Sequence, residues 1–376
     1  MSRMLLIATS AISLVSATAI AQNAAKPVAA STATKTAEKP WVAPGTKGSP
    51  IDGSIFHAQV LLDTAGFPTG VIDGKKGMIF KKAVQGFQQS KGLPVTGELD
   101  DATRSALLQL NRPSTAMVKL TAEDVAGPFT FPFPKKPEEQ SKLKGLYYRN
   151  MIEKVAERFH TTPDTIVALN GPDKQIGEGR LLRLPNVLPA NRDYAGTTGK
   201  EQGNLLALYN IDGLQPQGDF VVVDKSDGVM RVYKGAVPAG PYSSEKNRGP
   251  APTLNETPGQ LIAQFPVTMG SGHDPLPLGK WKATTYAFLP PFHYQPDLFW
   301  DAKDKTADDK TLPPGPNGPV GVAWLDLTKE HYGIHGTPSP ETIGRAESHG
   351  CIRLSNWDVI RVSRMMKPGF TAIFQA

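Results

Sequence analysis

A cysteine, two histidines and an arginine lie close together near the carboxyl end of the sequence. Cys351 stands in the run Ser-His-Gly-Cys-Ile-Arg that ends at Arg353, and His335 precedes it in a Gly-Ile-His-Gly run. A cysteine attacks a carbonyl only as the thiolate, so a base must take its proton or a positive charge must lower its pKa. Histidine can act as that base, and the Arg353 guanidinium favours the thiolate. The stretch therefore predicts nucleophilic acyl chemistry at Cys351.

Two glycines support this interpretation. Gly336 follows the first histidine and Gly350 precedes the cysteine. Because glycine has no side chain, backbone N–H groups beside it can approach a developing oxyanion closely. Such chemistry needs only a base and an oxyanion site, so we expect no cofactor.

Two other interpretations of the stretch remain open. Cys351 could be a structural core cysteine, or it could bind zinc together with three histidines, since these ligand types suit that metal. Against zinc, the sequence has no second cysteine, and a glycine interrupts the first histidine pair. We predict no metal. The histidines concerned are His331, His335 and His349.

The amino terminus has the layout of a secretory signal peptide. Arg3 precedes an apolar stretch, and Ala19-Ile20-Ala21 gives a small-x-small cleavage site. We predict a signal peptide over residues 1–21, cleaved near Ala21, and a periplasmic protein; an uncleaved anchor is the alternative. Exported proteins usually pair or avoid thiols, so a single cysteine in such a chain is a candidate reactive thiol.

The composition is that of a globular protein with many turns. The 376 residues are 39% hydrophobic and 20% charged, with 36 Gly and 34 Pro, and the formal net charge is +6. Residues 22–50 are rich in Ala, Thr, Lys and Pro, and we interpret them as a basic linker. Such a stretch can attract an anionic polymer, either peptidoglycan or nucleic acid. We expect no nucleic acid or DNA partner.

Residues 218–376 are predicted to form a β-rich domain. Short β-prone runs alternate with Gly and Pro turns, which favours an antiparallel sandwich or a barrel-like domain, and a helix is expected over 357–366. The expected strands are 220–223, 230–233, 261–267, 281–288, 322–327 and 370–374.

Two smaller units are expected before this domain. Residues 51–112 show three short apolar helical faces with glycine stops, the third carrying Ala106, Leu107 and Leu110. Residues 113–145 are rich in Pro and Lys and predict a linker. Residues 146–190 predict two helices and a strand over 179–185, so the fold class is multidomain.

The catalytic stretch resembles the signature of the L,D-transpeptidase catalytic domain, a β-sandwich family with the cysteine in a cleft. The resemblance rests on His335-Gly336, on Ser348 to Arg353, and on a framework that includes Pro277-Leu-Gly279-Lys280 and Gly315-Pro316-Asn317. It implies that Cys351 is the nucleophile, that His335 is the base and that the Gly336 carbonyl orients its ring.

The same resemblance implies further roles around the cysteine. The backbone N–H groups of Gly350 and Cys351 are oxyanion candidates, Ser348 and Arg353 shape the substrate cleft, and His349 supports the site rather than acting as the base. Members of the family attack the third residue of a wall stem peptide and release the terminal D-alanine. An amine or water then resolves the acyl-enzyme.

Both smaller units resemble wall-binding modules. Residues 51–112 resemble the peptidoglycan-binding-domain-1 family, a three-helix module, through Gly66-Phe67, Ile72-Asp73-Gly74, Phe87-Gln88 and Gly92-Leu93. Residues 146–190 resemble a LysM module through Val155 to Phe159, Leu169-Asn170, Gly179 and Leu184-Pro185, although the usual opening Gly-Asp-Thr strand is absent. We expect both to tether the enzyme to glycan strands and to leave its chemistry on soluble peptides unchanged.

The sequence therefore predicts a monomeric L,D-transpeptidase of the periplasm that cross-links peptidoglycan stem peptides in cell-wall and cell-shape biogenesis. Three alternatives stay open: an L,D-carboxypeptidase with the same residues, an enzyme that attaches an outer-membrane acceptor protein to the wall, and a wall-binding protein without activity.

Overall fold

The computed structural model describes residue 42 and residues 45–244, 259–346 and 348–376. The predicted signal peptide and most of the predicted basic linker lie outside the described residues. None of the helices in the described part of the chain is both long and apolar enough to span a membrane.

Three helices follow one another at the start of the described chain. Asp52 and Asp100 cap the first and third of them, because each carboxylate accepts hydrogen bonds from backbone N–H groups of the first turn. The third helix ends before Leu110, which is exposed rather than part of the apolar face that the sequence predicts. The helices are α1 (Gly53–Thr64), α2 (Met78–Ser90) and α3 (Asp101–Leu108).

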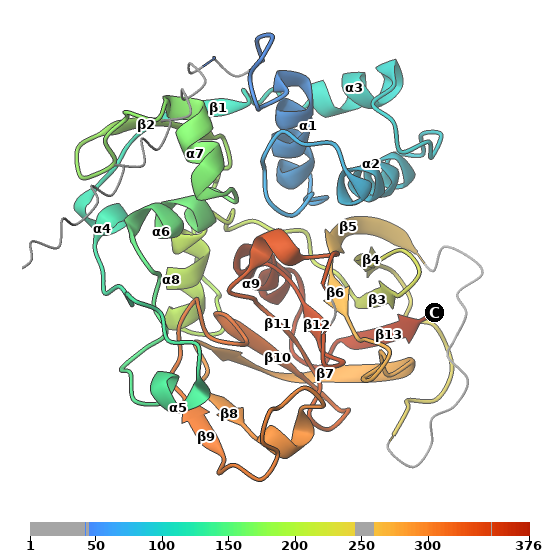
Figure 1. Cartoon of the computed structure of the whole chain (residues 1–376). Coiled ribbons are helices and arrows are strands. Elements are labelled where there is room, and N and C mark those ends of the chain that lie inside the picture. The colour runs from blue at the N-terminus through green and yellow to red at the C-terminus, as the bar shows by residue number, and fades with distance from the viewer. Residues whose placement is uncertain (1–41, 43–44, 245–258, 347) are drawn as a thin grey trace, which may run out of the picture. The chain divides into compact units, whose positions relative to one another are not determined.

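A second unit places four short helices between two paired strands (Figure 1). The sequence predicts a linker over 113–145, but this segment contains a strand that pairs antiparallel with the strand predicted over 179–185. Its partner lies far along the chain, so no local pattern marks it. The elements are β1 (Thr115–Lys119), α4 (Ala122–Val125), α5 (Pro137–Gln140), α6 (Met151–Arg158), α7 (Pro163–Asn170) and β2 (Leu181–Pro185), followed by α8 (Lys200–Leu208).

The carboxyl-terminal part contains a large β-sheet of nine strands, in the order β5-β4-β3-β13-β7-β10-β11-β12-β6. All six predicted strands and the predicted helix are confirmed, with ends shifted by one or two residues. The elements are β3 (Phe220–Asp224), β4 (Val229–Lys234), β5 (Gln260–Pro266), β6 (Thr268–Met269), β7 (Gly279–Phe288), β8 (Phe292–Tyr294), η1 (Pro296–Leu298), β9 (Lys310–Leu312), β10 (Ala323–Leu327), β11 (Gly333–His335), η2 (Pro340–Thr342), β12 (Ile352–Arg353), α9 (Asn356–Met365) and β13 (Thr371–Gln375).

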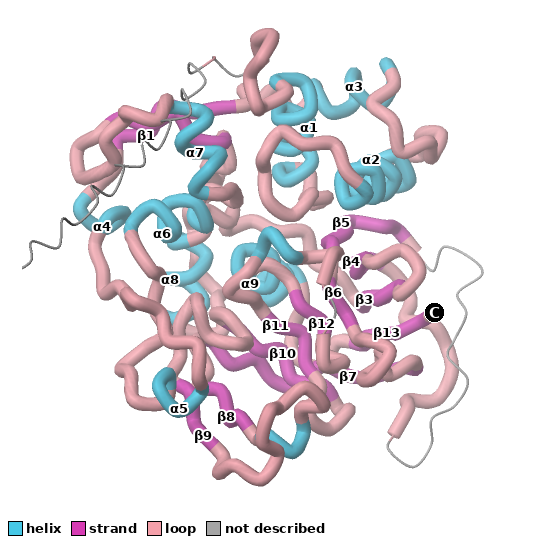
Figure 2. The backbone as a smooth tube through the Cα atoms, viewed as in Figure 1, coloured by secondary structure: helices cyan, strands magenta, loops and turns pink. Residues whose placement is uncertain are grey.

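Strand β7 joins the two halves of this sheet. Its first residues pair with β13, with Gly279 opposite Phe374, whereas its last residues pair with β10, with Phe288 opposite Ala323. Helix α9 packs against β10 and β11 and contributes to the main hydrophobic core. This arrangement places β11, which ends at His335, beside β12, which begins just after Cys351, near the β6 edge of the sheet (Figure 2).

The helical unit α1–α3 shares a hydrophobic core with the sheet. Phe67 and Phe87 belong to the same buried cluster as Phe220 and Leu261 of the sheet. The Gln264 side chain of β5 also donates a 2.7 Å hydrogen bond to the Lys82 carbonyl of α2. The helical unit therefore packs directly against the sheet, a contact that the sequence does not predict.

Candidate active site

The two residues predicted to do the chemistry lie on neighbouring strands. His335 is the last residue of β11, and Cys351 immediately precedes β12. These strands pair in parallel, with Ile334 opposite Ile352 and His335 opposite Arg353. The sheet therefore brings together residues that the sequence places on separate motifs.

The His335 imidazole is buried and held in one orientation. Its Nδ1 lies 2.7 Å from the Gly336 carbonyl oxygen, which can only accept, so Nδ1 carries the proton and the Nε2 lone pair is left for the reaction. The Trp324 ring stacks on the imidazole at 5.4 Å between ring centroids. Burial, together with the positive charge of Arg353, lowers the pKa of His335 to about 3. His335 is thus a neutral base at neutral pH.

The Cys351 thiol is also neutral in the resting protein. Its Sγ donates a 3.6 Å hydrogen bond to the His331 carbonyl. Burial raises the pKa of Cys351 to about 11, with Asp274 adding to the rise, while a hydrogen bond from the Gly333 backbone and the charge of Arg353 oppose it. The resting pair is a thiol and an imidazole, so the proton must move during attack on a substrate.

The turn before Cys351 is closed by internal contacts. The Ser348 hydroxyl donates a 2.7 Å hydrogen bond to the Cys351 carbonyl. Gly350 has a φ of 95° in the left-handed region, and a Cβ there would lie 2.4 Å from the Tyr332 ring. Only glycine fits this turn, which contains Gly350 and leads into Cys351.

The second histidine of the motif faces a different segment. His349 Nε2 lies 2.8 Å from an Asp301 carboxylate oxygen, and its ring contacts those of Phe299 and Trp300. These partners belong to the connection between β8 and β9. His349 therefore contacts the connection between β8 and β9, and its Nε2 is paired with Asp301.

Within the described part of the chain, no group of three or more His, Cys, Asp or Glu side chains is arranged to hold a metal ion. The histidines of the zinc alternative point to different partners. His331 lies 3.6 Å from Glu330, and His349 pairs with Asp301.

The structure adds residues that the sequence argument misses. Trp324 supports the His335 ring, Asp274 influences the Cys351 thiol, and Asn356 packs against Gly336. Asn356 follows the catalytic motif in the sequence, which indicates its place near the site but not its role. Trp324 and Asp274 reach the site only through the pairing of distant strands, which no local pattern reports.

Comparison with known proteins finds two family models. The model of the L,D-transpeptidase catalytic domain matches residues 253–374, and that of a "Putative peptidoglycan binding domain" matches residues 53–107.

Curated relatives match over a short stretch. The chain is 52% identical over 56 residues to the "Putative L,D-transpeptidase YkuD" of Bacillus licheniformis, which is 15% of this chain and 34% of that protein. It is 54% identical over 54 residues to the Bacillus subtilis protein of the same name, or 14% of this chain and 33% of that protein. The chain therefore spans about a third of the length of these relatives.

Solved structures give weaker likenesses. An L,D-transpeptidase from Mycobacterium smegmatis is 19% identical with a TM-score of 0.29, covering 42% of this chain and 58% of that one. An L,D-transpeptidase fragment from Xylanimonas cellulosilytica is 13% identical with a TM-score of 0.32, covering 90% and 98%. Neither score supports an inference about this chain.

Proposed function

We propose that this chain is a peptidoglycan L,D-transpeptidase whose catalytic domain is a β-sandwich with Cys351 as nucleophile and His335 as general base. The observation that carries the proposal is the placement of His335 at the end of β11 and of Cys351 immediately before the adjacent strand β12, with the imidazole neutral and its tautomer set by Gly336. The match of residues 253–374 to the L,D-transpeptidase catalytic domain supports the same reaction.

The reaction follows from these two neutral groups. His335 Nε2 takes the Sγ proton as Cys351 attacks the carbonyl of the third residue of a stem peptide. The tetrahedral oxyanion accepts hydrogen bonds from the N–H groups of Gly350 and Cys351. When the carbon–nitrogen bond breaks, the imidazolium returns the proton to the leaving D-alanine amine, and a thioester remains. An acceptor amine attacks the thioester, His335 takes its proton, and the thiol is restored.

The charge of Arg353 has a separate part in this scheme. It is the residue opposite His335 in the parallel pairing, and its charge lowers the pKa of that histidine. A guanidinium binds a carboxylate well, so we place the terminal carboxylate of the donor peptide here. Ser348 and His349 hold the turn and the connection that border this position.

The accessory units fit a protein that works on the cell wall. The match of residues 53–107 supports peptidoglycan binding, and residues 146–190, extended by β1, are proposed as a LysM-like module that contacts glycan strands. Both partners lie outside the cytoplasm, so we propose an exported, periplasmic monomer. The acceptor amine is a second stem peptide.

Product analysis on a soluble tetrapeptide stem tests the proposal. Mass spectrometry should find a cross-linked dimer and free D-alanine in equal amounts, and neither with Cys351→Ser. Tripeptide with free D-alanine and no dimer would mean an L,D-carboxypeptidase. Transfer only to an added acceptor protein would mean protein attachment. No product from a folded sample with a reduced thiol would contradict acyl chemistry at this site.

A further inference from the structure

A buried carboxyl group from the second unit reaches the helix that follows the catalytic cysteine. Glu157 of α6 is 4% exposed. One of its oxygens, Oε2, accepts hydrogen bonds from the Tyr148 hydroxyl at 3.2 Å, the Tyr209 hydroxyl at 3.4 Å and the Asn356 amide of α9 at 3.0 Å. The proposed chemistry uses none of these four groups.

The Asn356 side chain, which contacts Glu157, also contacts the backbone next to His335. Its amide nitrogen also donates to the Pro316 carbonyl at 3.1 Å, and its Oδ1 accepts from the Val322 N–H at 3.2 Å. The same oxygen lies 2.3 Å from where a Cβ on Gly336 would stand. The amide thus fills the space that only a glycine leaves, directly against the residue whose carbonyl fixes the His335 tautomer.

We infer that Glu157 is a positioning residue for the reaction, acting through Asn356 and Gly336 on His335. As the acceptor for the Asn356 NH₂ group, Glu157 helps decide which way round that amide lies. If the amide turned, Oδ1 would leave Val322 and the NH₂ group would press on Gly336. The Gly336 carbonyl, and with it the imidazole that it orients, would then shift. The inference rests on the role proposed for His335.

The inference assigns the unit around α6 to the catalytic machinery, because a side chain from residues 146–190 holds a base that belongs to residues 218–376. If α6 acted only by packing against α9, any buried contact to α9 would have the same effect on the reaction. Asp63 of α1 also reaches α9, through Arg361, but its side-chain partners among the described residues are Arg361 and His160, not Asn356 or Gly336. Asp63→Asn is therefore a matched control that disturbs a buried contact to α9 without touching the proposed chain of contacts.

The test compares three full-length variants by two readouts. Glu157→Met keeps the side-chain volume and removes the acceptor, Glu157→Gln keeps an acceptor oxygen, and Asp63→Asn is the control. The first readout is kcat and KM for D-alanine release from a soluble tetrapeptide. The second is the rate of Cys351 alkylation by iodoacetamide as a function of pH, which needs no substrate. Both are measured below the unfolding transition of each variant, as followed by circular dichroism.

We expect Glu157→Met to lower kcat by about tenfold or more while KM changes by less than about twofold, because a small misplacement of a catalytic group is costly. Its alkylation should shift to higher pH, as in His335→Ala. Glu157→Gln should recover kcat to within about threefold of wild type. Asp63→Asn should change neither readout in the folded protein.

Two results would overturn the inference: wild-type kcat and alkylation in Glu157→Met, or equal losses in Glu157→Met and Asp63→Asn. If Glu157→Met does not fold, Asn356→Ser replaces it, since serine is too short to contact both Glu157 and Val322. Wild-type kcat and alkylation in Asn356→Ser, or losses equal to those of Asp63→Asn, would then overturn the inference. A wild-type enzyme that releases no D-alanine but shows His335-dependent alkylation would contradict the proposed function alone. Alkylation unaffected by His335→Ala would contradict the positioning claim.

Discussion

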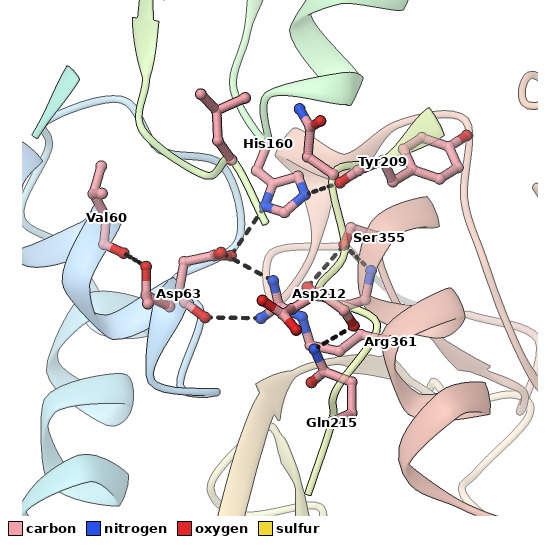
Figure 3. Close-up of polar contacts among 12 residues, drawn as sticks. Val60, Asp63, His160, Tyr209, Asp212, Gln215, Ser355 and Arg361 are labelled. Carbon is pink, nitrogen blue, oxygen red and sulfur yellow. Dashed lines mark hydrogen bonds and ion pairs between the residues drawn. The ribbon is translucent and has the colours of Figure 1, made fainter. Parts of the chain in front are cut away.

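The Arg361 guanidinium and the Asp63 carboxylate form a buried ion pair with an N···O distance of 2.9 Å, although 298 residues separate them in the sequence. His160 adds a second contact, since its Nδ1 lies 3.2 Å from the other oxygen of Asp63. Its ring stacks on Trp357 of α9. One carboxylate thus joins α1, the turn after α6 and α9 (Figure 3).

Removing this carboxylate should destabilise the whole protein. In Asp63→Ala the Arg361 charge stays buried without its partner, which costs about 3–5 kcal/mol in the free energy of unfolding. Urea denaturation followed by tryptophan fluorescence measures the change. As a control, Glu98→Ala removes an exposed pair with Lys76 and should leave the urea midpoint almost unchanged. Equal midpoints for Asp63→Ala and wild type would show that the buried pair does not hold these units together.

A fragment comprising residues 200–376 should not fold as the intact protein does. Its sheet would expose Phe220, Tyr233 and Leu261, which pack against the helical unit in the full chain. Exposed apolar area of this kind favours aggregation. Size-exclusion chromatography and circular dichroism of the fragment test this. A monomeric fragment with full activity on soluble peptides would contradict this expectation and would favour the first two units as tethers.

The acid limb of the activity profile should lie well below the ordinary histidine pKa of 6.5. Because the pKa of His335 is lowered to about 3, the base stays neutral and active at pH 5, and kcat/KM falls only as pH approaches that value or the protein unfolds. In Arg353→Met the limb should move to higher pH, since the Arg353 charge contributes to the lowering. A wild-type limb near pH 6.5 would contradict the neutral, buried base.

Glu157 should make stability depend on pH in a recognisable direction. Burial raises its pKa from 4.5 to about 8, so between these values the folded state binds a proton that the unfolded state does not. Its contribution to stability is fully present below pH 4.5 and is lost as pH rises through about 8. The Glu153 carboxyl on the same helix, which adds to this rise, is unchanged in a Glu157→Gln comparison.

The measurement is therefore a difference between two proteins. The free energy of unfolding of wild type minus that of Glu157→Gln should fall steadily from pH 5 to pH 8. A constant difference across this range would mean that the carboxyl group keeps an ordinary pKa.

Local sequence patterns predict many of the helices and strands, but they do not predict the contacts between units. Ala58, Leu61 and Leu62 repeat at helical spacing and are buried as expected, and the runs that become β3 and β4 alternate with turns. Glu157 and Asn356 are 199 residues apart, so no local sequence pattern predicts that they form a hydrogen bond. Strand β1 is missed for the same reason, because its pairing with β2 decides its structure.

The candidate site also has features that the sequence predicts and features that only the structure shows. Cys351 and His335 stand out because their residue types and glycine neighbours suit one chemistry. The neutral state of both groups depends on burial and on Arg353, which only the folded arrangement reveals.

Intact-protein mass spectrometry with a carbapenem tests the central claim most directly, namely that Cys351 is a nucleophile activated by His335. The strained cyclic amide imitates the peptide carbonyl, so attack should leave a stable covalent acyl-enzyme. The chain has one cysteine, so an adduct that disappears in Cys351→Ser locates the nucleophile. We predict a single adduct on wild type, formed with or without a chelator, absent from Cys351→Ser and strongly slowed in His335→Ala. No adduct on a folded protein with a reduced thiol, or an adduct that appears only after chelation, would contradict the account.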